Sequence, residues 1–384
     1  MHWALRKSVF RRAYALWGSL HPAGTAMSRL SVAPEPEWLR LHREGSEPPG
    51  YFFSDNVVSN ESSLLQAADE LLRIPKGLAY LGVGPEQNLT YLALVEPRLA
   101  FIVDARRDNA RLHFLYRAIF EEAADRSEFL LLLLGRQRTM DVQAGAPIGA
   151  LLDWVERCPR PEAAFANAHA RAIGRLERLG LPLGFWDRVR LRALHRRFFE
   201  RQMAVSFELV PPNGKTYPPL RQLLQSETAD GRQLGFLASE TAYRKVRALE
   251  MEGRVVPMVG DLAGPHTLRR IATELRRKSL VLGTAYLSNV EQYLFEEGIW
   301  PSWFENLKRL PRHPEAIVLR THLDQGRAHP RQWPGHRFTT IAQRLEHEIS
   351  RGSLPRSYWE LVTETERSAE NTGENGPKGA VRCG

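Results

Sequence analysis

Three positions along the chain could together bind an adenosine group. Gly82-Val83-Gly84 follows a short apolar run, Asp104 ends the next run, and Asp261 ends a third one. A glycine turn lets backbone amides approach a ligand, and Asp104, 20 residues after Gly84, is spaced to accept hydrogen bonds from both ribose hydroxyls. Asp261 could accept a hydrogen bond from the exocyclic amine of adenine. The pattern predicts a turn, a ribose acceptor and a base acceptor.

The same residues also allow structural interpretations. A glycine pair after a strand can be only a tight turn, and an acid that ends a strand can cap the next helix. The dinucleotide fingerprint GxGxxG would need a third glycine at position 87, where Gln87 stands. This difference argues against a nicotinamide or flavin cofactor.

A buried parallel sheet would hold these positions. The apolar runs are continuous rather than alternating, and they alternate with segments of helical periodicity, which is typical of strands buried on both faces. The predicted strands are 77–82, 99–104, 254–261, 279–286 and 316–320. The predicted helices beside them are 62–73, 85–94, 265–277 and 289–297. The sequence therefore predicts an α/β fold with a doubly wound, mostly parallel sheet.

The predicted sheet is interrupted between its second and third strands. Periodic segments at 111–123, 148–157, 163–179, 185–205 and 239–251 predict a large, mainly helical insertion, with one strand-like run at 207–210. The predicted parts are a basic, flexible leader (1–45), the first part of the Rossmann-like domain (46–109), the insertion (110–250), the second part (251–365) and a disordered tail (366–384). Whether residues 1–26 belong to the mature protein stays open, since Met27 is an alternative start.

Composition excludes several classes of protein. With 384 residues, 43% of them hydrophobic, the chain is long and apolar enough to bury a core. Its longest apolar run, Phe129 to Leu134, is far shorter than the roughly 20 residues of a membrane-spanning helix. Cys158 and Cys383 form no CxxC pair, and the 12 His residues show no HExxH or HxH spacing, so we expect no metal. We expect a cytoplasmic protein with no membrane partner.

Four segments carry a family resemblance: YLGVGPEQN at 80–88, IVDARR at 102–107, VPMVGDLAG at 256–264 and YLSNVEQYLF at 286–295. Together they resemble a little-characterised bacterial family with the class I S-adenosylmethionine-dependent methyltransferase fold. The resemblance covers about residues 50–325. It implies a Rossmann-like fold and an S-adenosyl-L-methionine site, and it leaves the methyl acceptor unknown.

The resemblance assigns roles to four of the residues named above. Gly82 and Gly84 match the first methyltransferase motif, near the methionine moiety. Asp104 matches the ribose-binding acid, and Asp261 matches the acid on the adenine side.

The chain also departs from the superfamily pattern. Tyr80 lies where many members have an acid before the glycines, and Glu86 replaces the usual last glycine, and both differences bear on cofactor affinity. The run Ser288-Asn289-Val290 does not reproduce the Asn/Asp-Pro-Pro-Tyr signature of amino-methylating enzymes. No motif therefore supports activity on exocyclic amines.

Two further pairs are candidate site residues. Asn289 and Glu291, just past the fourth predicted strand, could face the substrate, with Glu291 as a base or orienting acceptor; alternatively Asn289 caps a helix and Glu291 is solvated. Asn60 and Glu61, before the first strand, could close the cofactor pocket; alternatively they are a helix cap and a first-turn acid.

The insertion interleaves arginines with aromatic residues. Such a pattern can bind nucleic acid by charge and stacking, or can be an apolar stripe that packs inside with arginines around it. The residues are Phe185, Trp186, Arg188, Arg190, Arg192, Arg196, Arg197, Phe198, Phe199 and Arg201. Two functions follow from the whole sequence: an S-adenosylmethionine-binding methyltransferase-like protein, or a non-catalytic regulatory protein on the same fold that binds a nucleotide, a nucleic acid or a protein.

Overall fold

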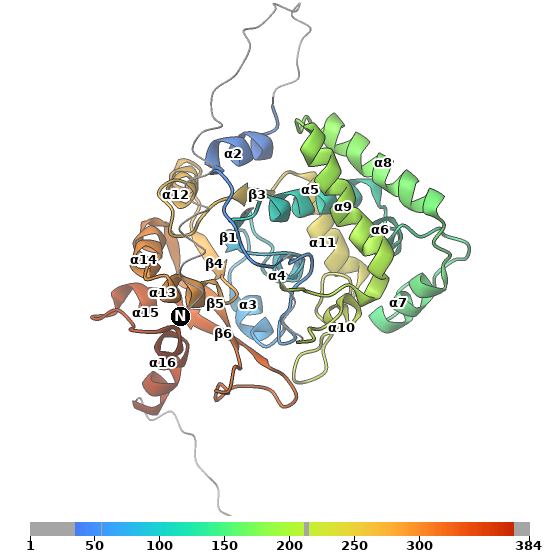
Figure 1. Cartoon of the computed structure of the whole chain (residues 1–384). Coiled ribbons are helices and arrows are strands. Elements are labelled where there is room, and N and C mark those ends of the chain that lie inside the picture. Colours follow the sequence, from blue (N-terminus) through green and yellow to red (C-terminus); the bar gives the residue numbers. More distant parts are fainter. Residues whose placement is uncertain (1–34, 55, 211–214, 372–384) are drawn as a thin grey trace, which may run out of the picture. The chain divides into compact units, whose positions relative to one another are not determined.

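A six-stranded sheet organises the fold (Figure 1). The computed structural model describes residues 35–54, 56–210 and 215–371, and the described elements belong to one unit that starts at Pro36. The strands are β1 (Ala79–Gly82), β2 (Leu99–Asp104), β3 (Val255–Val259), β4 (Leu282–Tyr286), β5 (Arg312–Leu323) and β6 (Phe338–Arg344). Their order is β3-β2-β1-β4-β5-β6, with β6 antiparallel to β5 and all other pairs parallel. The predicted α/β fold with a mostly parallel sheet is confirmed.

The strand order reverses beside β1. From β1 the chain adds β2 and β3 on one side, and then returns to place β4 on the other side of β1. Ala79 of β1 is therefore aligned with Leu99 of β2 and with Leu282 of β4. In open parallel sheets, ligands bind outside the carboxyl ends of the strands at such a reversal.

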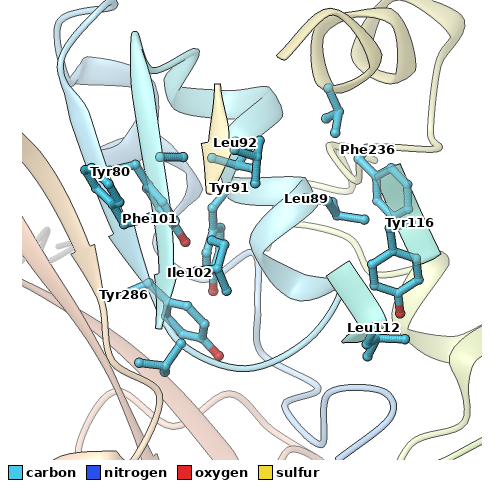
Figure 2. Close-up of a cluster of buried hydrophobic side chains, with 14 of the residues drawn as sticks. Tyr80, Leu89, Tyr91, Leu92, Phe101, Ile102, Leu112, Tyr116, Phe236 and Tyr286 are labelled. Atoms are coloured by element: carbon cyan, nitrogen blue, oxygen red, sulfur yellow. The ribbon is translucent and has the colours of Figure 1, made fainter. Parts of the chain in front are cut away.

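The central strands and the first crossover helix form the core. All nine residues of α4 (Gln87–Val95) are buried, because α3 (Ala68–Arg73) and α11 (Glu240–Met251) also pack against this helix. Figure 2 shows its Tyr91 beside Tyr286 of β4, and these two rings meet edge to face with their centroids 4.9 Å apart. An aromatic pair in this geometry contributes about 0.5–1.5 kcal/mol beyond the burial of its surface, so this contact helps to fix α4 against the sheet.

The residues between β2 and β3 are mainly helical, as predicted. The elements are α5 (Arg107–Glu122), α6 (Arg126–Leu134), α7 (Ile148–Arg157), α8 (Glu162–Arg178), α9 (Phe185–Arg201), the short 3-10 helix η1 (Gln202–Ala204), α10 (Leu220–Leu224) and α11. The strand-like run at 207–210 is not a strand; Leu209 forms one isolated bridge with Ser54. The helix α5 packs directly on β2 and β3, so it covers the sheet as well as opening the insertion.

The part of the chain after β3 completes the sheet and its covering helices. These helices are α12 (Thr267–Arg277), α13 (Val290–Glu296), α14 (Trp300–Arg309), α15 (Leu345–Ser350) and α16 (Tyr358–Asn371). The helix α16 continues to Asn371 and so includes residues 366–371 of the predicted disordered tail, and residues 372–384 lie outside the described part.

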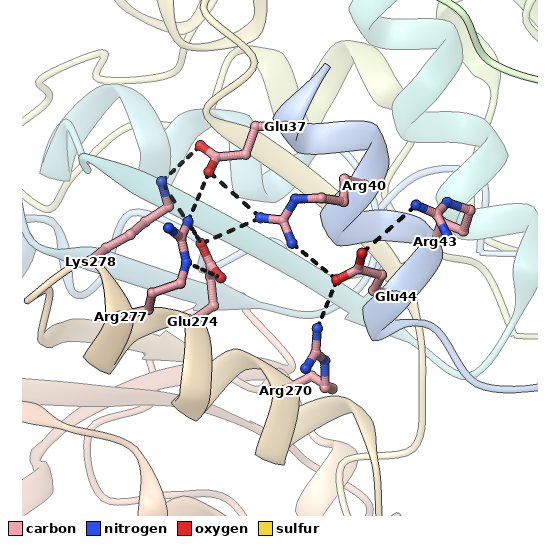
Figure 3. Close-up of polar contacts among 8 residues, drawn as sticks. All are labelled: Glu37, Arg40, Arg43, Glu44, Arg270, Glu274, Arg277 and Lys278. Atoms are coloured by element: carbon pink, nitrogen blue, oxygen red, sulfur yellow. Dashed lines mark hydrogen bonds and ion pairs between the residues drawn. The ribbon is translucent and has the colours of Figure 1, made fainter. Parts of the chain in front are cut away.

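The last residues of the predicted flexible leader form a helix. Residues 37–45 form α2 (Glu37–Gly45), which buries Trp38, Leu39 and Leu41. Figure 3 shows how charged side chains tie this helix to α12: Lys278 donates to Glu37 at 2.7 Å and Arg270 donates to Glu44 at 2.8 Å. An amphipathic helix that buries three large apolar residues docks by the hydrophobic effect, and its polar face supplies the ion pairs. The predictions for residues 1–34, including the start at Met27, lie outside the described residues.

One predicted helix is shorter than expected. Residues 62–67 of the predicted helix 62–73 are turns, and α3 starts only at Ala68. In these turns Gln66 and Ala68 donate to carbonyls three residues earlier, which is the bonding of a tighter turn than the α-helix.

None of the helices in the described part of the chain combines the length and the hydrophobicity that spanning a bilayer requires. The described residues also contain no group of three or more His, Cys, Asp or Glu side chains that could hold a metal ion.

Candidate functional site

The turn after β1 contains two glycines with different roles. A Cβ at Gly82 would lie 2.0 Å from Oδ1 of Asn88 and 2.6 Å from Cε1 of Tyr80, so this glycine makes room for the protein's own side chains. Gly84 has φ +77°, and a Cβ there would meet only the amide of Asn56, at 3.9 Å. Gly84 is therefore required for its left-handed conformation, and space remains above it.

The side chains of Tyr80 and Asn88 support this turn by hydrogen bonds. Tyr80 donates its hydroxyl to Oδ1 of Asn88 at 2.8 Å, and Nδ2 of Asn88 donates to the carbonyls of Val83, Gly84 and Pro85 at 2.8–3.1 Å. Tyr80, the departure from the superfamily pattern, is thus part of a buried support for the turn.

Glu86 joins the turn to the segment in front of it. Its carboxylate accepts the backbone N–H of Ser59 at 3.0 and 3.1 Å, one contact to each oxygen. Burial raises the pKa of Glu86 to about 7, although the Ser59 hydrogen bonds act in the opposite direction. The acid that replaces the usual last glycine therefore fastens residues 56–60 over the turn.

Asp104 ends β2 at the same edge of the sheet, but its carboxylate already has a partner. Arg106 donates its Nε to Oδ1 at 3.1 Å and its Nη2 to Oδ2 at 2.8 Å, and its backbone N–H also donates to Oδ1 at 2.8 Å. The two side chains are almost entirely buried. A ribose could reach both oxygens only if the guanidinium moved.

Asp261 lies exposed in the turn after β3, and Glu47 lies next to this turn. Oδ1 of Asp261 accepts the backbone N–H of Ala263 at 2.8 Å. The carboxylate of Glu47 accepts three backbone N–H groups, from Asp261, His266 and Thr267, at 2.8–3.1 Å. Since the amides of His266 and Thr267 lie at the start of α12, the negative charge of Glu47 also compensates the positive end of that helix.

Residues 46–54 run along the carboxyl edge of the sheet as a cover. The backbone N–H of Glu47 donates to Val259 at 2.8 Å, that of Gly50 donates to Ala105 at 2.8 Å, and Arg106 donates to the carbonyl of Ser54 at 3.4 Å. We refer to residues 46–54 as the edge segment.

A polar face of α5 lies below this cover. Several buried polar atoms there have no hydrogen-bond partner among the described residues: Oγ of Ser54, both amide atoms of Asn109, Nδ1 of His113 and the hydroxyl of Tyr116. Positions 109, 113 and 116 share one face of a helix. This face points to the turn after β1, because Nε2 of His113 lies 2.9 Å from the carbonyl of Gly84.

His113 presents an acceptor to this space. The Gly84 carbonyl can only accept a hydrogen bond, so Nε2 carries the proton and donates to it. Burial lowers the pKa of His113 to about 4, against the opposing effect of the Gly84 carbonyl, so the ring is neutral near pH 7. Nδ1 is therefore an unprotonated nitrogen without a donor. Polar residues at helical spacing on an otherwise apolar face could have signalled Asn109 and His113 in the sequence.

Glu61 lies deep in the protein rather than at the mouth of the site. It is 1% exposed and accepts hydrogen bonds from Thr321 at 2.7 Å, from Gln87 at 2.9 Å and from Ser288. Burial raises its pKa. It is not in the first turn of a helix, because turns precede α3. Asn60, next to it, is partly exposed.

Asn289 and Glu291, the two candidates after β4, also differ in burial: Asn289 is partly exposed and Glu291 is buried. Asn289 is partly exposed just past the strand end, and its Oδ1 lies 3.4 Å from the Ser288 hydroxyl. Its side chain makes no capping hydrogen bond to α13.

Glu291 is fully buried, and its carboxylate accepts hydrogen bonds from four N–H groups on three side chains. The indole nitrogens of Trp300 and Trp303 donate to it at 3.1 and 2.8 Å, and Arg320 contacts both of its oxygens. The structure therefore does not place this acid facing a substrate, nor in solvent; α13 turns it into the interior, where Arg320 balances its charge.

Two cavities are lined by none of the predicted site residues. One, of about 640 Å³, is lined by Arg98, Arg254 and Leu280, which precede β2, β3 and β4, so it opens at the amino edge of the sheet. The other, of about 280 Å³, lies between residues 66–70 and 331–342. The structure thus brings Gly84, Asp104 and Asp261 to one edge, with the edge segment against the ends of β2 and β3.

Comparison with known proteins gives a family but no activity. The model of a family described as "Domain of unknown function (DUF7790)" matches residues 56–144 and 213–376. No curated protein matches the chain. A solved structure, the rRNA methyltransferase aviRa from Streptomyces viridochromogenes, is similar at 13% sequence identity with a TM-score of 0.27, over 73% of this chain and 82% of that chain.

Proposed function

The chain belongs to the family of the Domain of unknown function (DUF7790), and from this premise we propose that its carboxyl sheet edge binds S-adenosyl-L-methionine as a methyltransferase-like site. The observation that carries the proposal is the common position of three residues. Gly84 follows β1, Asp104 ends β2 and Asp261 follows β3, on three adjacent parallel strands next to the reversal of strand order. This is the place where such sheets bind ligands.

The unpartnered atoms beneath the edge segment fit a ligand of this kind. Buried polar groups are almost always hydrogen-bonded, so a cluster of orphaned ones needs an explanation. The amide of Asn109 can donate and accept, the Nδ1 of His113 can accept, and the hydroxyls of Ser54 and Tyr116 can do both. An adenosyl group carries matching hydroxyls, an amine and ring nitrogens.

Each of the three residues at the strand ends then has a defined role in binding the cofactor. Asp104 would accept the ribose hydroxyls after Arg106 releases it, Asp261 would face the adenine amine, and the open turn at Gly84 would let backbone approach the methionine part. When bound, the cofactor supplies a methyl group already activated by its sulfonium, so the protein needs mainly to orient the acceptor and to exclude water.

The remaining candidates divide between the mouth and the interior. Asn289 and Asn60 are partly exposed, and we propose that they line the mouth of the site, with Asn289 orienting the acceptor. Glu61 is a buried support that joins α4 to the ends of β4 and β5. We propose a structural role for Glu291, because its carboxylate is already used by Arg320 and two tryptophans.

Calorimetric titration with S-adenosylmethionine and with S-adenosylhomocysteine tests the proposal. We expect micromolar binding that Asp104→Ala abolishes. The matched control is Asp153→Ala, which removes a more exposed acid on α7. Absence of binding to both ligands by the folded wild-type protein would overturn the proposal.

A second function has support from one feature of the site. Arg106 donates to both oxygens of Asp104, and Glu86 accepts the backbone N–H of Ser59, so polar groups at this edge already have partners within the protein. These contacts favour a non-catalytic protein that keeps the fold and binds a nucleotide, a nucleic acid or a protein. Binding of S-adenosylhomocysteine without any methyl transfer would favour it.

A further inference from the structure

The start of α9 exposes two large aromatic side chains. Phe185 is 72% and Trp186 is 71% exposed, and their ring centroids lie 5.3 Å apart in an edge-to-face arrangement. Phe198 and Phe199, further along the same helix, are buried. The packing interpretation of these aromatics therefore holds only for the second half of α9. An exposed aromatic pair is a mark of an interaction surface.

Exposed arginines lie on α9 and on the neighbouring helix α5. Arg188 and Arg192 are exposed on α9, and Arg107 is exposed at the first residue of α5. Arg188 pairs with Glu177 at the surface, whereas Arg107 and Arg192 form no ion pair with any described residue. The guanidinium of Arg192, two turns further along α9, lies 5.4 Å from the centroid of the Phe165 ring. The charges of Arg107 and Arg192 are thus available to an anion.

The wider surface is positively charged. Residues 160–201 hold ten Lys or Arg and four Asp or Glu, a net charge of +6 within a chain of +9. Acids of neighbouring elements offset part of this charge: Asp108 pairs with Arg190, Glu122 with Arg175 and Glu208 with Arg197. Arg107, the first residue of α5, and Arg192, in the middle of α9, keep their charge without an ion pair to a described residue.

This surface adjoins the candidate site. Arg111 of α5 donates to Asp187 at 2.6 Å, and Arg190 pairs with Asp108, so the first turns of α9 and α5 lie against each other. The helix α5 begins at Arg107, three residues after Asp104 at the end of β2. The exposed aromatic pair therefore flanks the carboxyl edge of the sheet.

We propose that Phe185, Trp186, Arg107 and Arg192 form a binding surface for single-stranded RNA. Unpaired bases stack on aromatic rings, and arginines bind the phosphates between them. A duplex would not offer free base faces, and unpaired bases are the usual target in RNA. The binding surface does not depend on the cofactor; only the further step, that the bound RNA is the methyl acceptor, rests on the proposed function.

Fluorescence anisotropy with a labelled 20-nucleotide RNA tests the surface, using the full chain without cofactor. We expect binding at 50 mM salt that weakens with salt, and weaker binding of the same RNA annealed to its complement. Trp186→Ala should lower the affinity about tenfold, because stacking on one aromatic residue has an effect of this order. Arg192→Gln should reduce the slope of log affinity against log salt by about 0.7. These side chains are exposed, so the melting temperature should stay unchanged.

The controls remove similar groups elsewhere. Met251→Ala removes an exposed apolar side chain at the amino edge, and Arg269→Gln removes an exposed arginine on α12; both should bind RNA like the wild type. Absence of RNA binding, or equal losses in the controls, would overturn the proposal. Binding to vesicles of anionic phospholipid in place of RNA, or self-association that Trp186→Ala abolishes, would overturn it as well.

The two proposals can fail separately. Trp186→Ala should leave the affinity for S-adenosylhomocysteine unchanged, and Asp104→Ala should leave the affinity for RNA unchanged. RNA binding without cofactor binding would remove the proposed function and keep the surface. Cofactor binding without RNA binding would remove the proposed RNA surface and keep the proposed function.

Discussion

Arg106 forms an ion pair with the carboxylate of Asp104, two residues before it in the chain. Its guanidinium donates to both oxygens, at 3.1 and 2.8 Å, and both side chains are about nine-tenths buried. An acid at the end of the second strand is where a ribose would bind, and here a neighbouring cation takes the same lone pairs. Ligand binding and this ion pair are therefore in competition.

Removing the competitor should strengthen binding. We expect Arg106→Gln to raise the affinity for S-adenosylhomocysteine about tenfold, since hydrogen bonds to charged groups contribute about 1.5–3 kcal/mol. Calorimetric titration measures this change. Arg107→Gln removes the same charge next to it without a contact to Asp104, and should leave the affinity unchanged. Weaker binding by Arg106→Gln would mean that the guanidinium itself holds the ligand.

The orphaned amide of Asn109 gives a prediction with opposite signs for stability and binding. The side-chain amide of Asn109 is buried without a partner, and such a group destabilises the ligand-free protein by about 1–3 kcal/mol. Asn109→Leu removes this group. We expect a melting temperature about 2 °C higher and an affinity for S-adenosylhomocysteine at least fivefold lower.

Thr339→Val is the matched control for that experiment. Its hydroxyl is also buried and unpartnered, but it lies on β6, away from the carboxyl ends of β1, β2 and β3. This variant should be as stable as the wild type or more stable, with unchanged ligand affinity. If Asn109→Leu gains stability without losing affinity, Asn109 does not contact the ligand.

Glu86 should make stability fall with rising pH. Burial raises its pKa to about 7 from 4.5, so the native state holds a proton between about pH 4.5 and 7 that the unfolded chain has lost. The stabilisation is complete below pH 4.5 and disappears as the pH passes 7, a change of up to about 3 kcal/mol. Glu86→Gln cannot ionise, so its melting temperature should rise relative to the wild type between pH 5 and 8.

Thermal melts at pH 5, 6, 7 and 8 measure that difference. The exposed Glu227→Gln is the control and should follow the wild type across the series. A constant difference between Glu86→Gln and the wild type at all four values would show that Glu86 keeps the same protonation state throughout.

Glu291 should matter for stability. Removing one partner of a buried ion pair leaves an uncompensated charge, so Glu291→Ala should lower the free energy of unfolding by about 3–5 kcal/mol, because Arg320 would stay buried. Urea unfolding measures the loss. Glu296→Ala, on the exposed side of the same helix, should change it by less than about 0.5 kcal/mol. Wild-type stability in Glu291→Ala together with lost methyl transfer would restore the catalytic hypothesis.

Several parts of the fold follow from local patterns. The five parallel strands lie at or near their predicted ranges because strands buried on both faces need continuous apolar runs, such as 99–104. The edge strand β6, with the sequence FTTIAQR, has neither a continuous apolar run nor a strict alternation of apolar and polar residues, and it was not predicted. The helix α2 was not predicted either, since its apolar face has meaning only once β3 is beside it.

The sequence by itself determined the strand ends that carry Gly84, Asp104 and Asp261, because the apolar run of each strand and the residues of the turn after it lie within a few positions of each other. Only the tertiary structure determined which side chains contact the residues at and near these strand ends. Glu47 reaches the turn after β3 from more than 200 residues away, and Glu291 meets Arg320 inside the protein. Such pairs depend on how elements pack, and a carboxylate next in sequence to a strand end looks the same whether it faces a ligand, a backbone amide or an arginine.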